Sequence, residues 1–245
     1  MFWVVYAVPI TYTTGMSGVW VLLLLIAASS IPAVAVYTWY RIARYPFSGL
    51  RFLLLLLTGA AAYFPVLLLQ SIIPASIVAG RQLSALAEIF LRTAFIEEVS
   101  RLFVLLIFFF VARRIAHSEN TGAWREVMIG SAAGLVAGFG FAILESVIIG
   151  AANAAVIPLR LITAAPIHAA CGARTGAAVV MFRAYPGQAV LRFLTAIAIH
   201  GIYNSIIIIP GLPAIAAVFI ALSALASSIL SIHSGMKQKQ ELPSS

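Results

Sequence analysis

Long, nearly uninterrupted runs of apolar residues constrain this chain more than any other feature of its sequence. A helix needs about 20 apolar residues to span a bilayer. Such windows give predicted spans at residues 17–40, 50–73, 92–112, 127–150, 157–182, 189–209 and 213–232. Of the 245 residues, 63% are hydrophobic and only 9% are charged, which is more apolar surface than a water-soluble domain could bury. The lipid bilayer is therefore the expected surroundings of the chain.

The apolar runs also define the fold class. They are continuous and lack the two-residue alternation of a membrane β-barrel, so we predict an all-α, polytopic transmembrane helix bundle of about seven spans. A single integral membrane domain is expected over residues 1–245, with a polar tail at 233–245. The third helix is expected to begin before the lipid boundary or to follow a surface helix, because residues 82–94 have helical periodicity. A break near Pro158 and Pro166 could divide the fifth span.

Basic residues alternate between the predicted loops and set the orientation of the bundle. Lys and Arg gather after the first, third, fifth and seventh spans, and the intervening connections carry few. By the positive-inside rule, the N-terminus is predicted outside and the C-terminus in the cytoplasm. The net charge of +8 then reflects topology, and no nucleic acid is expected as a partner. We expect a multi-pass integral membrane protein of a prokaryotic plasma membrane.

Ionisable side chains within the predicted spans are costly to bury in lipid and mark candidate functional positions. Together with one amide side chain, that of Asn204, they make up the set Glu97, Glu98, Arg101, Glu145, His168, Arg174, His200 and Asn204. At about 1.5 Å of rise per residue, its carboxyl, imidazole and amide groups lie roughly 16 to 27 Å from the cytoplasmic helix ends. Four helices thus bring these groups to one level in the outer half of the membrane, which indicates a site.

Spacing along the helices supports a clustered site. Arg101 follows Glu98 by three residues and Glu97 by four, so the arginine can neutralise one carboxyl and position it. His200 and Asn204 share a helix face at four-residue spacing.

Glycines recur at four-residue spacing in the fourth and fifth spans, at 130, 134 and 138 and at 172 and 176. Such small-residue ridges let helix backbones approach closely. We therefore expect these two spans to pack tightly around the polar groups.

Residue content excludes several hydrolytic chemistries. The chain has no aspartate, which excludes a paired-aspartate protease, and it has no HExxH zinc signature. GMSG at 15–18 matches a short serine-nucleophile pattern, but a polar helix start is the better interpretation of Ser17. Cys171, three residues from His168, is interpreted as a small helix-packing residue. Glutamate- and histidine-based activation of water remains.

Two mechanisms for activating the water remain open. In one, a carboxylate takes a proton from water while His200 and Asn204 stabilise the oxyanion. In the other, Zn²⁺ polarises the water and is bound by ligands drawn from Glu97, Glu98, Glu145, His168 and His200. The alternative function is a non-catalytic membrane scaffold or a proton-coupled transporter that uses the same buried Glu, His and Arg residues.

Four short segments carry a further signal: EEVSR at 97–101, FAILE at 141–145, the isolated His168 with Gly176, and HGIYN at 200–204. In order and spacing they resemble the motifs of the PrsW family of intramembrane proteases, which is related to the CAAX prenyl proteases and their bacteriocin-processing relatives. The resemblance covers roughly residues 90–210. It implies that Glu97 and Glu98 are the essential pair and that Glu145, His168 and His200 complete the centre. It also implies a single-pass membrane protein substrate, such as an anti-sigma factor, cut near the outer face.

The chain departs from these patterns at three positions. The first motif ends in Arg101 where the PrsW family usually has lysine, a change that keeps the charge. Ser146 stands where the second motif usually continues with Asn. Glu145 stands where the CAAX prenyl proteases place histidine, so a farnesyl-cysteine substrate is not expected.

We therefore predict an intramembrane endopeptidase that hydrolyses a peptide bond with a glutamate- and histidine-activated water. Glu97 is the predicted general base, and Glu98 is held by Arg101. The remaining predicted catalytic residues are Glu145 and His168, which position water or metal, and His200 and Asn204, which serve the oxyanion.

Overall fold

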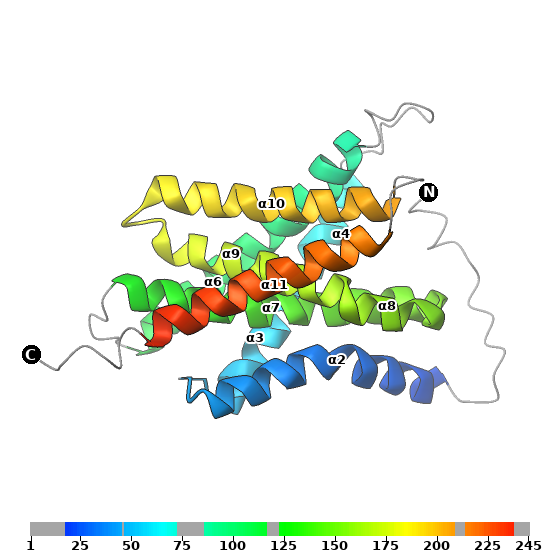
Figure 1. Ribbon diagram of the computed structural model, residues 1–245, viewed down its shortest axis with the longest axis horizontal. Helices are drawn as coiled ribbons and strands as arrows, with labels where there is room; N and C mark the ends of the chain where they lie inside the picture. Colours follow the sequence, from blue (N-terminus) through cyan, green and yellow to red (C-terminus); the bar gives the residue numbers. More distant parts are fainter. Residues whose placement is uncertain (1–17, 46, 73–85, 117–122, 209–213, 238–245) are drawn as a thin grey trace, which may run out of the picture.

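The structure is a computed structural model that describes residues 18–45, 47–72, 86–116, 123–208 and 214–237. The described residues form helices and no strand (Figure 1). In chain order the elements are α2 (Gly18–Ile42), α3 (Gly49–Ala61), α4 (Tyr63–Ile72), the π-helix η1 (Glu88–Phe95), α6 (Ile96–Ala116), α7 (Ala123–Ala152), the 3₁₀ turn η2 (Ala154–Val156), α8 (Ile157–Ile162), α9 (Ala164–Met181), α10 (Pro186–Ile208) and α11 (Ala214–Lys237).

Several of these helices are long and apolar enough to cross a membrane. Among the described residues there are five: Gly18–Ile42, Gly49–Ile72, Glu126–Ala152, Pro186–Ile208 and Ile215–Met236. The pair Ala154–Ile162 and Ala164–Met181 becomes a sixth if its two parts, bent by 46°, form one span. The all-α, multi-pass fold is therefore confirmed, and the chain is an integral membrane protein.

The third predicted span corresponds to α6. This helix has charged residues near both ends, among them Glu97, Glu98 and Arg101, and their number keeps it outside the set of uniformly apolar helices. It is preceded without interruption by η1, so the expectation of an early helix start holds for the described part of residues 82–94. Short π-helical stretches occur frequently at functional sites.

The helix α7 forms the centre of the bundle. In its apolar stretch 83% of the residues are buried, against 22–33% in the four other apolar helices. In Figure 1, α2 lies along one side of α7 and α9, and α10 lies along the other. The outer helices expose large apolar side chains such as Trp20, Leu24 and Leu191, as lipid contact requires.

Glycines allow α7 to touch α9 through its backbone. A Cβ added at Gly134 would overlap the carbonyl of Gly172, and one added at Gly138 would overlap the carbonyl of His168. The predicted small-residue ridges are therefore confirmed as the contact between these helices. Because the backbone of His168 itself lies at this contact, the close approach of the two helices fixes the position from which its side chain extends.

Candidate functional site

Four helices bring the predicted polar groups together in the interior. Glu97 and Glu98 lie in the first turn of α6, and the other members are Glu145 on α7, His168 on α9 and His200 on α10. All except Glu145 are almost wholly buried as residues. Glu145 keeps 16% of its side chain exposed and so lies at the edge of the cluster.

Glu98 is held on both carboxylate oxygens. Oε1 forms an ion pair with Arg101 and lies 3.0 Å from Nδ1 of His200. Oε2 accepts a hydrogen bond of 3.0 Å from the hydroxyl of Thr175 on α9. A carboxylate with this many partners is fixed in place, so Glu98 is suited to orient its neighbours.

Arg101 connects this carboxylate to the second histidine. Its guanidinium is fully buried and lies over the ring of Phe141, 4.9 Å from the centroid. Its Nη2 lies 3.2 Å from Nδ1 of His168. Because a guanidinium can only donate, Nδ1 is assigned as the acceptor, and Nε2 of this imidazole carries the proton.

Glu145 receives that proton in a hydrogen bond. Nε2 of His168 donates to Oε2 of Glu145 over 2.8 Å. The same oxygen forms an ion pair with Arg160 of α8, whose Nε donates to the hydroxyl of Ser146 over 3.0 Å. Ser146 therefore helps to hold Arg160, Arg160 holds Glu145, and Glu145 holds the ring of His168.

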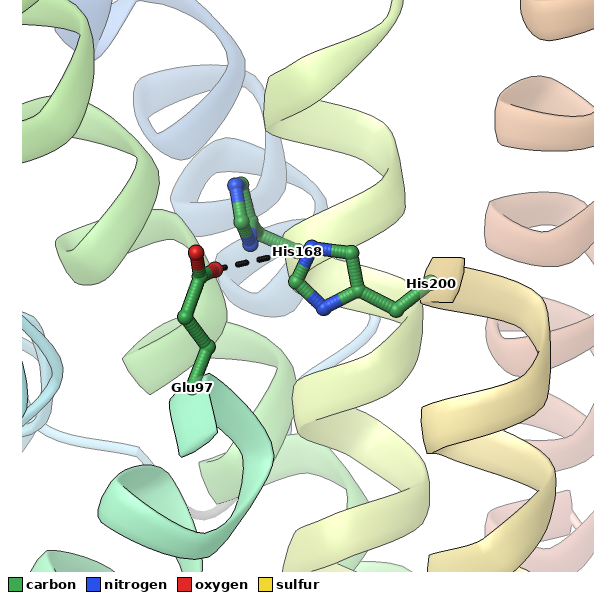
Figure 2. Close-up of side chains that lie close together, drawn as sticks. All are labelled: Glu97, His168 and His200. Carbon is green, nitrogen blue, oxygen red and sulfur yellow. Dashed lines mark ion pairs between the residues drawn. The ribbon is translucent and has the colours of Figure 1, made fainter. Parts of the chain in front are cut away.

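Glu97 differs from the other two carboxylates. Its Oε2 is buried and, among the described residues, has no hydrogen-bond partner. It lies 3.5 Å from Nε2 of His200, the pair joined by the dashed line in Figure 2. With Nδ1–H of His200 donated to Glu98, Nε2 is an acceptor as well. Two acceptors that face each other across this distance would be satisfied by a proton or a cation between them.

The residues in Figure 2 fit a metal ion. Glu97, His168 and His200 are each buried, and their nearest ligand atoms all lie within 4.8 Å of one another. Two histidines and one glutamate form a donor set found at catalytic zinc sites. Each imidazole also gives its other N–H to a carboxylate, Glu145 or Glu98, as metal-binding histidines usually do.

A second group, Glu98 with Cys171 and His200, meets the same distance limit but fits less well. Both oxygens of Glu98 already have partners, and Sγ of Cys171 lies 3.4 Å from the carbonyl oxygen of Ala196. Cys171 also packs among apolar residues that include Ile167. Its sequence-based interpretation as a packing residue agrees with these contacts.

Asn204 is not brought into the cluster. Asn204 is half-buried on α10 and, among the described residues, makes no side-chain hydrogen bond to these groups. Its role at an oxyanion stays a prediction. Ser17 lies outside the described residues.

Sequence reasoning missed Arg160 and Thr175. From the sequence, Arg160 is only one of the few basic residues at the connection between the fourth and fifth predicted spans, yet it is the cation paired with Glu145. The signal was the need of Glu145 for a counterion, which the next arginine along the chain supplies. Thr175 carried no signal, because a threonine in a helix usually bonds its own backbone.

Comparison with known proteins places these observations in context. A model of a protein family described as PrsW family intramembrane metalloprotease matches residues 49–229. The match runs from the start of α3 into α11 and includes every residue of the cluster. No curated protein and no solved structure matches the chain.

Proposed function

Because the chain belongs to the PrsW family of intramembrane metalloproteases, we propose that it hydrolyses peptide bonds at a zinc ion held by Glu97, His168 and His200. The enzyme is a protease that resides in the membrane and acts on a membrane protein. We propose further that the substrate is a single-pass protein, such as an anti-sigma factor, cut near the outer face of a prokaryotic plasma membrane. Seven spans, with the N-terminus outside and the C-terminus in the cytoplasm, agree with that face and with the basic loops.

One observation carries the proposal. Three buried residues from α6, α9 and α10 offer ligand atoms that lie within 4.8 Å of one another. Among the described residues, Oε2 of Glu97 has no hydrogen-bond partner. When bound there, zinc would act as a Lewis acid and lower the pKa of a bound water. Zinc is favoured over magnesium or calcium because imidazole nitrogen is a poor ligand for those ions.

The protein side chains divide the remaining tasks. Glu145 and Glu98 each hold the N–H of one imidazole, so that the opposite nitrogen points to the centre. With a metal bound, Glu97 would hold the ion through one carboxylate oxygen and face the attacking water with the other. It would accept a proton from that water and later give the proton to the leaving nitrogen. Asn204, one helical turn beyond His200, is the proposed donor to the oxyanion.

Arg101 also affects how His168 would bind a metal ion. Its Nη2 donates to the nitrogen of His168 that has the free lone pair. A cation and the guanidinium therefore compete for this nitrogen, and metal binding requires Nη2 to turn away from it. The ion pair between Nη1 of Arg101 and Glu98 would hold the guanidinium during such a turn.

The test is cleavage of a single-pass membrane substrate by the purified protein in proteoliposomes. Incubation with a strong zinc chelator should abolish cleavage, and added Zn²⁺ should restore it. Metal analysis should find about one zinc per chain in the active sample. If cleavage continues at full rate after the zinc has been removed, the metal assignment is wrong, although the family membership stands.

Replacing Arg160 tests the positioning of Glu145. Arg160→Gln removes the ion pair and should lower zinc affinity or turnover about 10–100-fold, the usual effect of losing a group that orients a ligand. Arg160→Lys should recover part of the loss. Arg41→Gln, at an exposed arginine of α2, is the matched control and should change neither quantity. Equal zinc affinity and turnover in the wild type and Arg160→Gln would contradict the role.

A further inference from the structure

A polar cavity lies between α7, α9, α10 and α11, separate from the cluster around His168. Its volume is about 80 Å³, which leaves room for a group of a few heavy atoms. It is lined by Arg174, Arg192, Ser131, Ser227, Ser228 and Ser231. Two arginines and four serines around one space inside a membrane bundle are unusual, because the surrounding helices are apolar.

Arg174 is held at the wall of this cavity. Its Nη1 donates to the carbonyl of Ala170 and to the hydroxyl of Ser228, each over 2.9 Å. The Ser228 hydroxyl donates in turn to the carbonyl of Ala224 over 3.0 Å. The remaining guanidinium nitrogens have no protein partner among the described residues. They are donors that a bound anion could accept from.

The charge of the cavity is not balanced by the protein. Elsewhere in the described part of the chain, Arg92 pairs with Glu88, Arg101 with Glu98, and Arg160 with Glu145. In the part of the chain that the structure describes, neither Arg174 nor Arg192 lies within ion-pair distance of a carboxylate. Two like charges that share a small cavity in a medium of low dielectric repel each other, and an anion between them removes that repulsion.

The depth of the cavity matches a lipid headgroup. Arg174 lies about 10 Å before the end of α9 at Met181, and Arg192 about 9 Å after the start of α10 at Pro186, at 1.5 Å per residue. This level lies near the boundary between the headgroups and the hydrocarbon core. His168 lies roughly 9 Å farther along α9, so the cavity does not overlap the proposed metal centre.

We propose that this cavity binds the phosphoryl group of an anionic lipid. Arginine presents a fork of donors that matches phosphate oxygens, and the serine hydroxyls supply further donors. The helix ends next to the cavity are those assigned to the cytoplasm, where anionic lipids gather and where basic pockets between spans bind their headgroups. The site would anchor α10 and α11 to α9 through a ligand that the membrane itself provides.

The experiment measures thermal stability and lipid retention of the purified protein in an uncharged detergent. Short-chain phosphatidylglycerol, short-chain phosphatidylcholine and inorganic phosphate are titrated separately, and retained lipid is counted by native mass spectrometry. Phosphatidylglycerol should raise the unfolding temperature of the wild type with saturation. In Arg174→Gln and Arg192→Gln, half-saturation should need at least about tenfold more lipid, consistent with the loss of one charge-assisted contact. Arg183→Gln, an exposed arginine at the same end of α9, should match the wild type.

The other outcomes overturn the proposal in separate ways. Equal binding of phosphatidylglycerol by the wild type and both glutamine variants would remove the cavity as the site. An equal effect of phosphatidylcholine would show no selection for an anionic lipid, and an equal effect of inorganic phosphate would identify a free ion as the ligand. Arg174→Lys keeps the cation and should retain part of the binding, which separates loss of the site from loss of the fold. None of these measurements depends on protease activity.

Discussion

Glu97→Gln is expected to reduce cleavage by on the order of 10²–10⁴-fold, the contribution of a positioned acid–base group. The amide keeps the size of the side chain but cannot take a proton from water. It is also a much weaker metal ligand than a carboxylate, so the zinc content of the purified protein should fall with the activity. The fold should survive, because Oε2 of Glu97 has no hydrogen-bond partner to lose among the described residues.

Two companion variants make this measurement specific. Glu88→Gln alters a glutamate on the same segment that pairs with Arg92 instead, and it should cleave at the wild-type rate. Glu98→Gln should instead lower the stability of the protein, because it leaves the buried Arg101 without its counterion. Removing one partner of a buried ion pair typically destabilises a protein by about 3–5 kcal/mol. Zinc analysis, turnover and unfolding temperature are compared across the set, and an active, zinc-loaded Glu97→Gln enzyme would contradict the assigned centre.

Gly138→Ala is expected to destabilise the protein strongly although it adds one methyl group. That methyl would overlap the backbone of His168 and Ala169, which has no flexible end that could move aside. Overpacking typically costs about 1–3 kcal/mol and more where backbones must separate. The shift of α9 would also displace His168, so residual cleavage should fall together with the unfolding temperature.

Gly187→Ala provides the control for this prediction. A Cβ added at Gly187 meets nothing within 4 Å, and the residue lies in the first turn of α10. The same mutation there should leave the unfolding temperature and turnover unchanged. Stability of Gly138→Ala equal to that of Gly187→Ala would show that α7 and α9 are not in backbone contact.

Much of this arrangement could be predicted from the sequence because helices in lipid obey simple spacing rules. Rise per residue gives the depth of a side chain, so the common level of Glu97, Glu145, His168 and His200 could be estimated before any coordinates. Four-residue glycine spacing identified the contact between α7 and α9. Both inferences depend on distances along one helix, which the sequence contains.

The partners within the cluster could not be predicted in the same way. Whether Arg101 meets His168, and whether Glu145 meets Arg160, depends on how each helix is rotated about its axis. Rotation is set by packing against neighbours, and spacing along one helix does not contain that information. The 46° bend between α8 and α9 adds a further unknown, because it determines where Arg160 lies relative to His168.

The touching backbones of α7 and α9 restrict how a substrate can reach the centre. No solvent or peptide can pass between two helices whose glycines exclude even a methyl group. The accessible rim is instead the side beside α8, where the side chains of Arg160 and Glu145 remain 17% and 16% exposed. A transmembrane segment has its peptide groups closed in its own helix, so it would have to unwind locally at that rim before one bond could be cut. Residues that favour unwinding, such as glycine and proline, are therefore the expected neighbours of the cleaved bond.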